Sequence, residues 1–339
     1  MQKAKIISKA FLISIAINGF AFLSFNMSIS GFPVYISSQG SDYITTGLVT
    51  SLSAVAALLI RPFAGYFINQ FDVVKVLRFG LMLMSFSPIV CLSLNHVSIS
   101  LIMRFIQGIG WGLSSTACST MIANSLPLSR LSEGIGYSGL VSSVCSAFAP
   151  AFAVYLFEKH GAYLMLLCIS ISTLLPLILM TCKSDYGYEN ANTNFNKVII
   201  SDDFVKNAFI PSILAFFITI SYSPIVTFVS QYVNQIKINP AFFFVSYAIT
   251  TVIIRPLTGF YIDRYGYFMP SMLSIIFALM GLFMLYKCES AVELVLSAIF
   301  SGLSMGIGTN AFQSMAVAKV PPSKRGIAIS VFLFGFKEN

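Results

Sequence analysis

The sequence predicts an all-α polytopic membrane protein built from two six-helix bundles that are related by a parallel internal repeat, with the second bundle incomplete. Three observations predict this fold class. Hydrophobic residues make up 57% of the chain and charged residues only 9%, whereas soluble proteins carry about 25% charged residues. The apolar residues form long runs rather than amphipathic stripes. Finally, two parts of the chain repeat each other at a constant offset.

The apolar runs are long enough to be membrane spans, because a bilayer core about 30 Å thick needs roughly 20 apolar residues per helix. The N-terminal run continues past Pro33 without a small-residue cleavage site, so we interpret it as the first span and not as a signal peptide. An eleventh run begins near Gly326 and stops at the C-terminus. The ten complete spans are predicted at 10–36, 44–68, 74–94, 97–124, 134–157, 162–182, 208–232, 241–262, 268–287 and 292–318.

Lysine and arginine predict the orientation of the spans, since these residues gather in cytoplasmic loops. They lie before the first span and in the loops that follow the even-numbered spans. We therefore expect a multi-pass protein of the cell membrane with a cytoplasmic N-terminus. The basic residues are spread singly and form no patch, so nucleic acid is not an expected partner despite the net charge of +8.

One long polar segment, 184–207, divides the chain and predicts its domains. Residues 1–183 form the N-terminal six-helix bundle, 184–207 a cytoplasmic linker, and 208–339 an incomplete C-terminal bundle.

The internal repeat relates the two bundles. The segment IRPFAGYFINQFD (60–72) matches IRPLTGFYIDRYG (254–266) at an offset of 194, and the same offset carries Gly108 to Gly302 and Pro127 to Pro321. Six spans separate the copies, an even number, so both copies have the same orientation. Such a parallel repeat places the binding site between the halves, near the middle of the membrane.

The repeat also predicts that the second bundle is shorter than the first. The first bundle ends near Lys183, so the equivalent end lies near 377, about 38 residues beyond Asn339. We therefore expect a C-terminally truncated protein with about 10 or 11 of 12 helices, which on its own would be unstable and transport poorly. A natural ten-span protein with a short re-entrant end is the alternative.

Two short patterns resemble signatures of the major facilitator superfamily, a family of secondary transporters. The pattern G-x-x-x-D-R-x-G follows the second span of the C-terminal bundle in full. In the N-terminal bundle only its first glycine, Gly65, matches, and Asn69, Gln70 and Asp72 replace the aspartate, the arginine and the second glycine. Span four contains RFIQGIG, which matches R-x-x-Q-G-x-G. The resemblance covers almost the whole chain and implies two six-helix bundles and transport by alternating access.

The first pattern implies a conformational latch, in which the aspartate faces a helix N-terminus of the opposite half, where the helix dipole favours an anion. Asp263 is expected to face the start of span five near Gly134, and the neutral Asn69 to hold span eleven less well. Solvated charges in a tight loop are the alternative. The latch residues are Gly65, Asn69, Gly259, Asp263, Arg264 and Gly266.

In this family, the first and fourth spans of each half line the cavity, which implies a set of substrate-path candidates. For the amides, hydrogen bonding between helices is the alternative; for Arg104, it is a position at the outer membrane interface. The candidates are Asn18, Asn26, Arg104, Gln107, Trp111, Tyr222, Asn310 and Gln313. Arg61 and Arg255, each followed by a proline, are repeated near span ends, where structural anchoring is favoured over substrate contact.

No Asp or Glu lies in the middle of a span, which argues against an enzyme and against a buried metal site. No cofactor is expected. The expected function is secondary active transport of a small molecule, with efflux of small amphipathic compounds preferred. Uptake or uniport of a metabolite, or a non-functional truncated copy, are the alternatives. Expected partners are the lipid bilayer, the substrate and a coupling proton or ion, and we expect a monomer.

Overall fold

The computed structural model describes residues 8–94, 96–181, 202–235, 238–318 and 320–335, which are helical almost throughout and contain no strand. Short 3-10 turns precede α5 and α10 at Leu128–Arg130 and Pro322–Lys324. The helices are α1 Lys9–Ser38, α2 Tyr43–Phe71, α3 Val73–Leu94, α4 Val97–Asn124, α5 Leu131–Thr181, α6 Asp202–Gln235, α7 Ala241–Tyr265, α8 Phe268–Tyr286, α9 Ala291–Ala318 and α10 Arg325–Gly335.

Most helices follow the predicted spans closely. The bounds of α1–α4 and α7–α9 agree with the prediction to within three residues. The long helix α5 covers predicted spans five and six and breaks at Gly161, whose φ of 80° and ψ of 178° are not helical. A positive φ costs glycine little, so the chain turns between the two spans at this residue.

The start of α6 differs from the prediction. The helix begins at Asp202, six residues before the predicted span, inside the segment interpreted as linker. The first turn of α6 therefore lies within the segment 184–207.

The helices have the composition of membrane spans. Eight of those described are long and apolar enough to cross a membrane. The described part of α6 and α10 contain shorter apolar stretches, Phe209–Tyr222 and Arg325–Phe334. Large apolar side chains cover their outer faces, as along α7. The chain is therefore an all-helical, multi-pass membrane protein.

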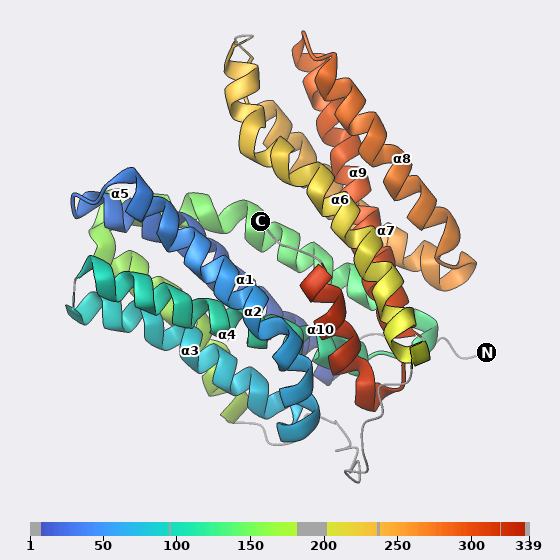
Figure 1. Cartoon of the computed structure of the whole chain (residues 1–339), viewed down its shortest axis with the longest axis horizontal. Coiled ribbons are helices and arrows are strands. Elements are labelled where there is room, and N and C mark those ends of the chain that lie inside the picture. Colours follow the sequence, from blue (N-terminus) through green and yellow to red (C-terminus); the bar gives the residue numbers. More distant parts are fainter. Residues whose placement is uncertain (1–7, 95, 182–201, 236–237, 319, 336–339) are drawn as a thin grey trace.

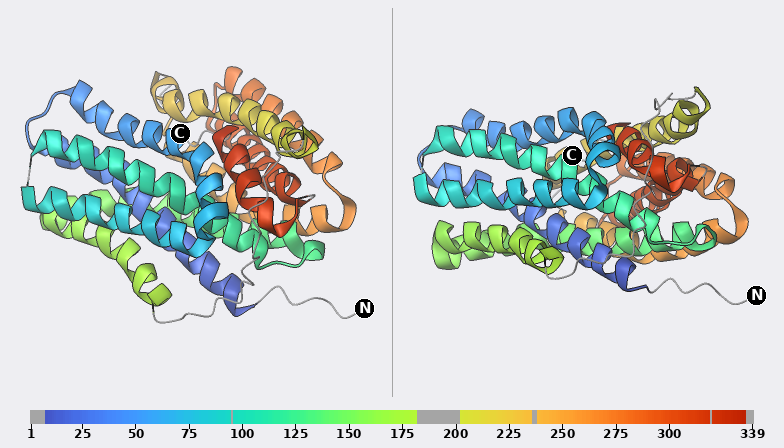
Figure 2. Two further views of the ribbon diagram at one scale, coloured as in Figure 1. Left: turned by 60° about the horizontal axis from the view of Figure 1, so that its bottom comes forward. Right: turned by 90° about the horizontal axis from the view of Figure 1, so that it is seen from below.

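The helices fall into two groups (Figure 1). We call α1–α5 the first half and α6–α10 the second half. In Figure 1, α6, α8 and α9 point away from the first half, and α10 lies between the two groups. The views in Figure 2 also place α10 beside α2. The halves meet where α5 packs against α7 and α9, and where α10 packs against α2 and α4.

Apolar clusters hold each group together and join them at one end. Clusters around Trp111 and around Phe32 lie inside the first half, and a smaller one around Phe243 lies inside the second. Another cluster contains residues of both halves, among them Ile135 from α5 and Phe332 from α10. Side chains of both halves pack together in this shared cluster, which stabilises the contact between the halves.

Candidate functional site

Arg104 lies inside the first half and is fully buried. Its Nε donates to the Val49 carbonyl (3.1 Å), Nη1 to Oε1 of Gln107 (2.6 Å) and Nη2 to the Ser53 hydroxyl (2.8 Å). The guanidinium carbon lies 5.0 Å from the centre of the Phe32 ring. Neutral oxygens and an aromatic face therefore solvate this charge, which ties α4 to α2 and α1.

The polar contacts of Arg104 continue through Gln107. Nε2 of Gln107 donates to the Ser28 hydroxyl (2.8 Å), which donates to the Ser24 carbonyl in the turn before it. The Ser24 hydroxyl in turn donates to the Ile169 carbonyl of α5. Arg104 and Gln107 lie three residues apart on one face of α4, and serines of α1 complete the network.

Trp111 and the asparagines of α1 have different surroundings. Trp111 is buried, with its ring 4.3 Å from that of Phe25 in a stacked arrangement. Asn18 is also buried, and its Nδ2 donates to the Ser142 hydroxyl of α5 (3.0 Å). Asn26 is half-buried, and its amide donates to the Phe22 carbonyl in its own helix (2.9 Å). Of these three residues, only Asn26 is partly accessible in this conformation.

The substrate-path candidates of the second half also differ in how far they are buried. Tyr222 is half-buried, stacks on Tyr247 with ring centres 4.7 Å apart, and borders a cavity of about 10 Å³. This space is about that of one water molecule. Gln313 is half-buried. Asn310 is buried where α9 meets α7 and α5, and its amide donates to the Arg255 carbonyl (2.9 Å).

The latch aspartate of the second half contacts the opposite half. The Asp263 carboxylate accepts hydrogen bonds from the backbone N–H groups of Ser132 (2.9 Å) and Glu133 (2.8 Å) at the start of α5. The first N–H groups of a helix lack intrahelical partners, and they carry the positive end of the helix dipole. The Glu133 side chain forms a salt bridge with Arg130 (2.7 Å). The Glu133 carboxylate therefore does not compete with Asp263 for these backbone N–H groups.

The other latch residues of the second half surround this contact. Arg264 points to the neighbouring Tyr265 ring, 5.2 Å from its centre. Gly266 ends α7 with a φ of 90°. Burial raises the pKa of the Tyr267 phenol, which lies just beyond α7, and the Asp263 carboxylate raises it further. The phenol therefore stays neutral, and Asp263 supplies the negative charge at this contact.

Glycines let the halves approach each other at two equivalent positions. A Cβ on Gly259 would overlap the Ser132 carbonyl oxygen and lie 2.7 Å from Glu133 Cα. A Cβ on Gly65 would lie 2.8 Å from Ile327 Cα in α10. Contacts this close to backbone exclude any side chain, so both positions require glycine.

The arginines near the helix ends also cross between the halves. Nη1 of Arg61 donates to the Leu333 carbonyl of α10 (2.8 Å). Nη1 of Arg255 donates to the Gly139 carbonyl of α5. The repeat offset of 194 relates Arg61 to Arg255 and Gly139 to Leu333. The two contacts are therefore symmetry-related copies of each other, and we call the region that contains them the junction.

The copies differ at the latch position of the first half. Asn69 occupies the place of Asp263, and among the described residues its side chain has no hydrogen bond to α10. Asp72 occupies the place of Gly266 and has a φ of 80°, which costs a residue with a Cβ about 1–3 kcal/mol. The first-half copy of the latch therefore lacks the negative charge that Asp263 supplies in the second half, and its loop is strained at Asp72.

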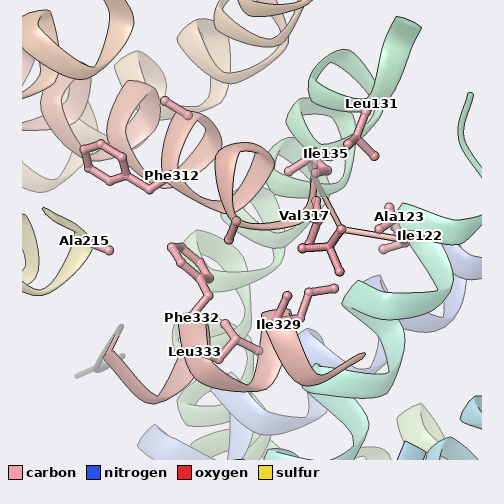
Figure 3. Packing of buried hydrophobic residues seen from close by; sticks show 14 of the residues in the cluster. Ile122, Ala123, Leu131, Ile135, Ala215, Phe312, Val317, Ile329, Phe332 and Leu333 are labelled. Atoms are coloured by element: carbon pink, nitrogen blue, oxygen red, sulfur yellow. The ribbon is translucent and has the colours of Figure 1, made fainter. Parts of the chain in front are cut away.

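The shared apolar cluster lies beside these polar contacts (Figure 3). Ile122 and Leu131 from the first half face Val317 and Ile329 from the second half in this view. A cavity of about 500 Å³ borders the same region, lined by the connections before α5 and α10 and by Arg325. The junction therefore combines an apolar core with charged contacts at its edge.

Sequence reasoning missed two features of the structure. Arg325 is buried at the start of α10 and bonds to the end of α4. The hydroxyls of Tyr35 and Tyr232 donate to the carbonyls of Cys91 and Cys288, each pair 56 residues apart. That equal separation within both halves was the available signal for the tyrosine bonds. In the described part of the chain, no three His, Cys, Asp or Glu side chains form a metal-binding group.

Known proteins match this chain over most of its length. A sequence profile of the Major Facilitator Superfamily matches residues 15–337. The staphylopine export protein of Staphylococcus aureus (strain Mu50 / ATCC 700699) is 24% identical over 252 residues, which are 68% of this chain and 60% of that protein. Multidrug resistance protein 2 of Bacillus subtilis (strain 168) is 27% identical over 130 residues, 38% of this chain and 32% of that protein.

A solved structure shares the fold. The crystal structure of the human organic anion transporter MFSD10 superimposes with a TM-score of 0.77 at 13% sequence identity, covering 97% of this chain and 90% of that one. The match to the export protein spans less than two thirds of its length, and that to the multidrug resistance protein about one third.

Proposed function

Because the chain belongs to the major facilitator superfamily, we propose that it carries out secondary active transport by alternating access, with efflux of small amphipathic compounds as its activity. Members of this superfamily are transporters and not enzymes. The junction carries the proposal, because two symmetry-related contacts join the halves at one end of their helices. Two such halves can rock about a central site.

Orientation gives the junction its role. The positive-inside rule places the loops after α2 and α7 in the cytoplasm of a cell membrane, together with the N-terminus. The junction, which contains the ends of both helices, is then a closed cytoplasmic gate. In this conformation the substrate site faces outward, and opening of the gate exposes it to the cytoplasm.

Substrate contact falls on the half-buried candidates. Asn26, Tyr222 and Gln313 are partly accessible, whereas Arg104 and Trp111 are buried within the first half. Amides and a tyrosine bind polar groups while their apolar surroundings bind hydrocarbon, which suits an amphipathic solute. The buried candidates contribute by holding α4 in position.

Efflux is preferred over uptake because both named relatives are export or resistance proteins by description. Metabolite uptake or uniport, and a copy without transport activity, are the alternatives. We propose that the protein is a monomer in the lipid bilayer. Its other partners are the exported solute and a coupling proton or ion.

A transport assay tests the proposal. If the protein transports, inside-out vesicles that contain it should accumulate fluorescent amphipathic dyes when a proton gradient is applied; no accumulation supports the alternative of a copy without transport activity. Gly259→Leu, which prevents the close approach of α7 to α5, should abolish this accumulation. Gly47→Leu is the matched control, because a Cβ there meets no atom within 4 Å. Equal dye uptake by vesicles with native protein and with Gly259→Leu contradicts the proposal.

A further inference from the structure

One buried cation breaks the symmetry of the junction. Arg325 begins α10 and is 3% exposed. Its Nη1 donates to the Ala123 carbonyl (2.6 Å) and lies 3.4 Å from Oδ1 of Asn124. The repeat offset places Leu131 at the equivalent position of the first half, where it packs in the shared apolar cluster.

The partner of Arg325 is the C-terminal end of a helix. Ala123 and Asn124 are the last residues of α4. Carbonyls in the last turn of a helix lack intrahelical partners and carry the negative end of the dipole. A guanidinium at this end is stabilised in the same way as the Asp263 carboxylate at the N-terminus of α5.

The two edges of the junction therefore use opposite charges. On one edge, Asp263 of the second half binds the N-terminus of α5. On the other edge Asn69 is neutral, and the charged contacts between the halves there are those of Arg61 with Leu333 of α10 and of Arg325 with Ala123 at the end of α4. We infer that Arg325 is a gating residue that keeps the α2–α10 edge of the cytoplasmic gate closed, in place of the carboxylate that position 69 lacks.

This inference rests on the proposed alternating access. Its test measures opening of the gate by cysteine labelling and does not depend on a transport assay. A cysteine at Ala328, which is fully buried in α10, reports opening in a background where the six native cysteines are replaced. A membrane-impermeant maleimide is applied to the cytoplasmic side of inside-out membranes. Labelling after denaturation gives the total amount of protein.

Arg325→Gln removes the charge, so we expect the cysteine to label at least about tenfold faster, as for the loss of one hydrogen bond to a charged group. Arg78→Gln is the matched control. Arg78 donates to the Met180 carbonyl at the end of α5 (2.9 Å), a contact of the same kind within the first half. This control should label at the native rate.

Adding Asn69→Asp to the Arg325→Gln variant should restore closure of the gate. The repeat places residue 69 opposite the backbone N–H groups of Gly326 and Ile327, as Asp263 lies opposite those of Ser132 and Glu133. A new carboxylate should therefore return labelling to near the native rate. Arg325→Lys keeps the charge, so its labelling rate should lie between those of the native protein and Arg325→Gln. This variant replaces Arg325→Gln in the test if the Gln variant does not fold.

The outcomes separate the two proposals. If Asp263→Ala accelerates labelling and Arg325→Gln and Arg325→Lys do not, Arg325 has only a packing role and the inference is wrong. If none of these variants accelerates labelling, the junction is not a gate, and the proposed function is wrong at this point.

Discussion

Removal of the Asp263 carboxylate should open the proposed cytoplasmic gate. Asp263 accepts two backbone hydrogen bonds, of 2.9 and 2.8 Å, from the start of α5. A hydrogen bond to a charged group contributes about 1.5–3 kcal/mol. Since Asp263 is half-buried, solvent weakens both bonds, and we expect their loss in Asp263→Ala to shift the equilibrium by about 2–4 kcal/mol. Each 1.4 kcal/mol changes a population about tenfold, so the open population should rise roughly 30- to 800-fold.

The same cysteine at Ala328 measures this change through its labelling rate. Asp263→Asn keeps one acceptor oxygen and loses the charge, so its rate should lie between those of the native protein and Asp263→Ala. Asn69→Ala is the matched control, because Asn69 has no hydrogen bond to α10 among the described residues. A native rate for Asp263→Ala, or an equal rise for Asn69→Ala, refutes the reasoning.

Further predictions concern stability, the buried arginine and topology. Asp72→Gly should stabilise the protein by about 1 kcal/mol, because it relieves a positive φ; no rise in the thermal unfolding midpoint contradicts this. Arg104→Lys loses the planar fork that makes three hydrogen bonds, so both dye transport and the unfolding midpoint should fall, and unchanged values for both argue against a role. Cysteines at Ser38 and Asn190 should react with an impermeant reagent from outside and inside, respectively, and the reverse pattern overturns the orientation.

The sequence by itself determined the membrane spans and the equivalence of the two halves. Runs of apolar residues identify spans because the bilayer core favours apolar side chains over a length of about 20 residues. The spans are helical because a helix pairs the backbone polar groups within itself. The family resemblance of the G-x-x-x-D-R-x-G pattern also implied that Asp263 faces the start of α5, and its partners lie within two residues of Gly134.

Only the tertiary structure decided which helix ends and buried polar groups meet. Arg325 looks like an ordinary loop cation in the sequence, and its bond to Ala123 joins residues 202 positions apart. The pairing of Arg104 with Val49 and Ser53 likewise depends on how α2 packs against α4. Periodicity assigns a residue to a face of its own helix. The atoms opposite that face are set by the packing of other helices, which local sequence does not specify.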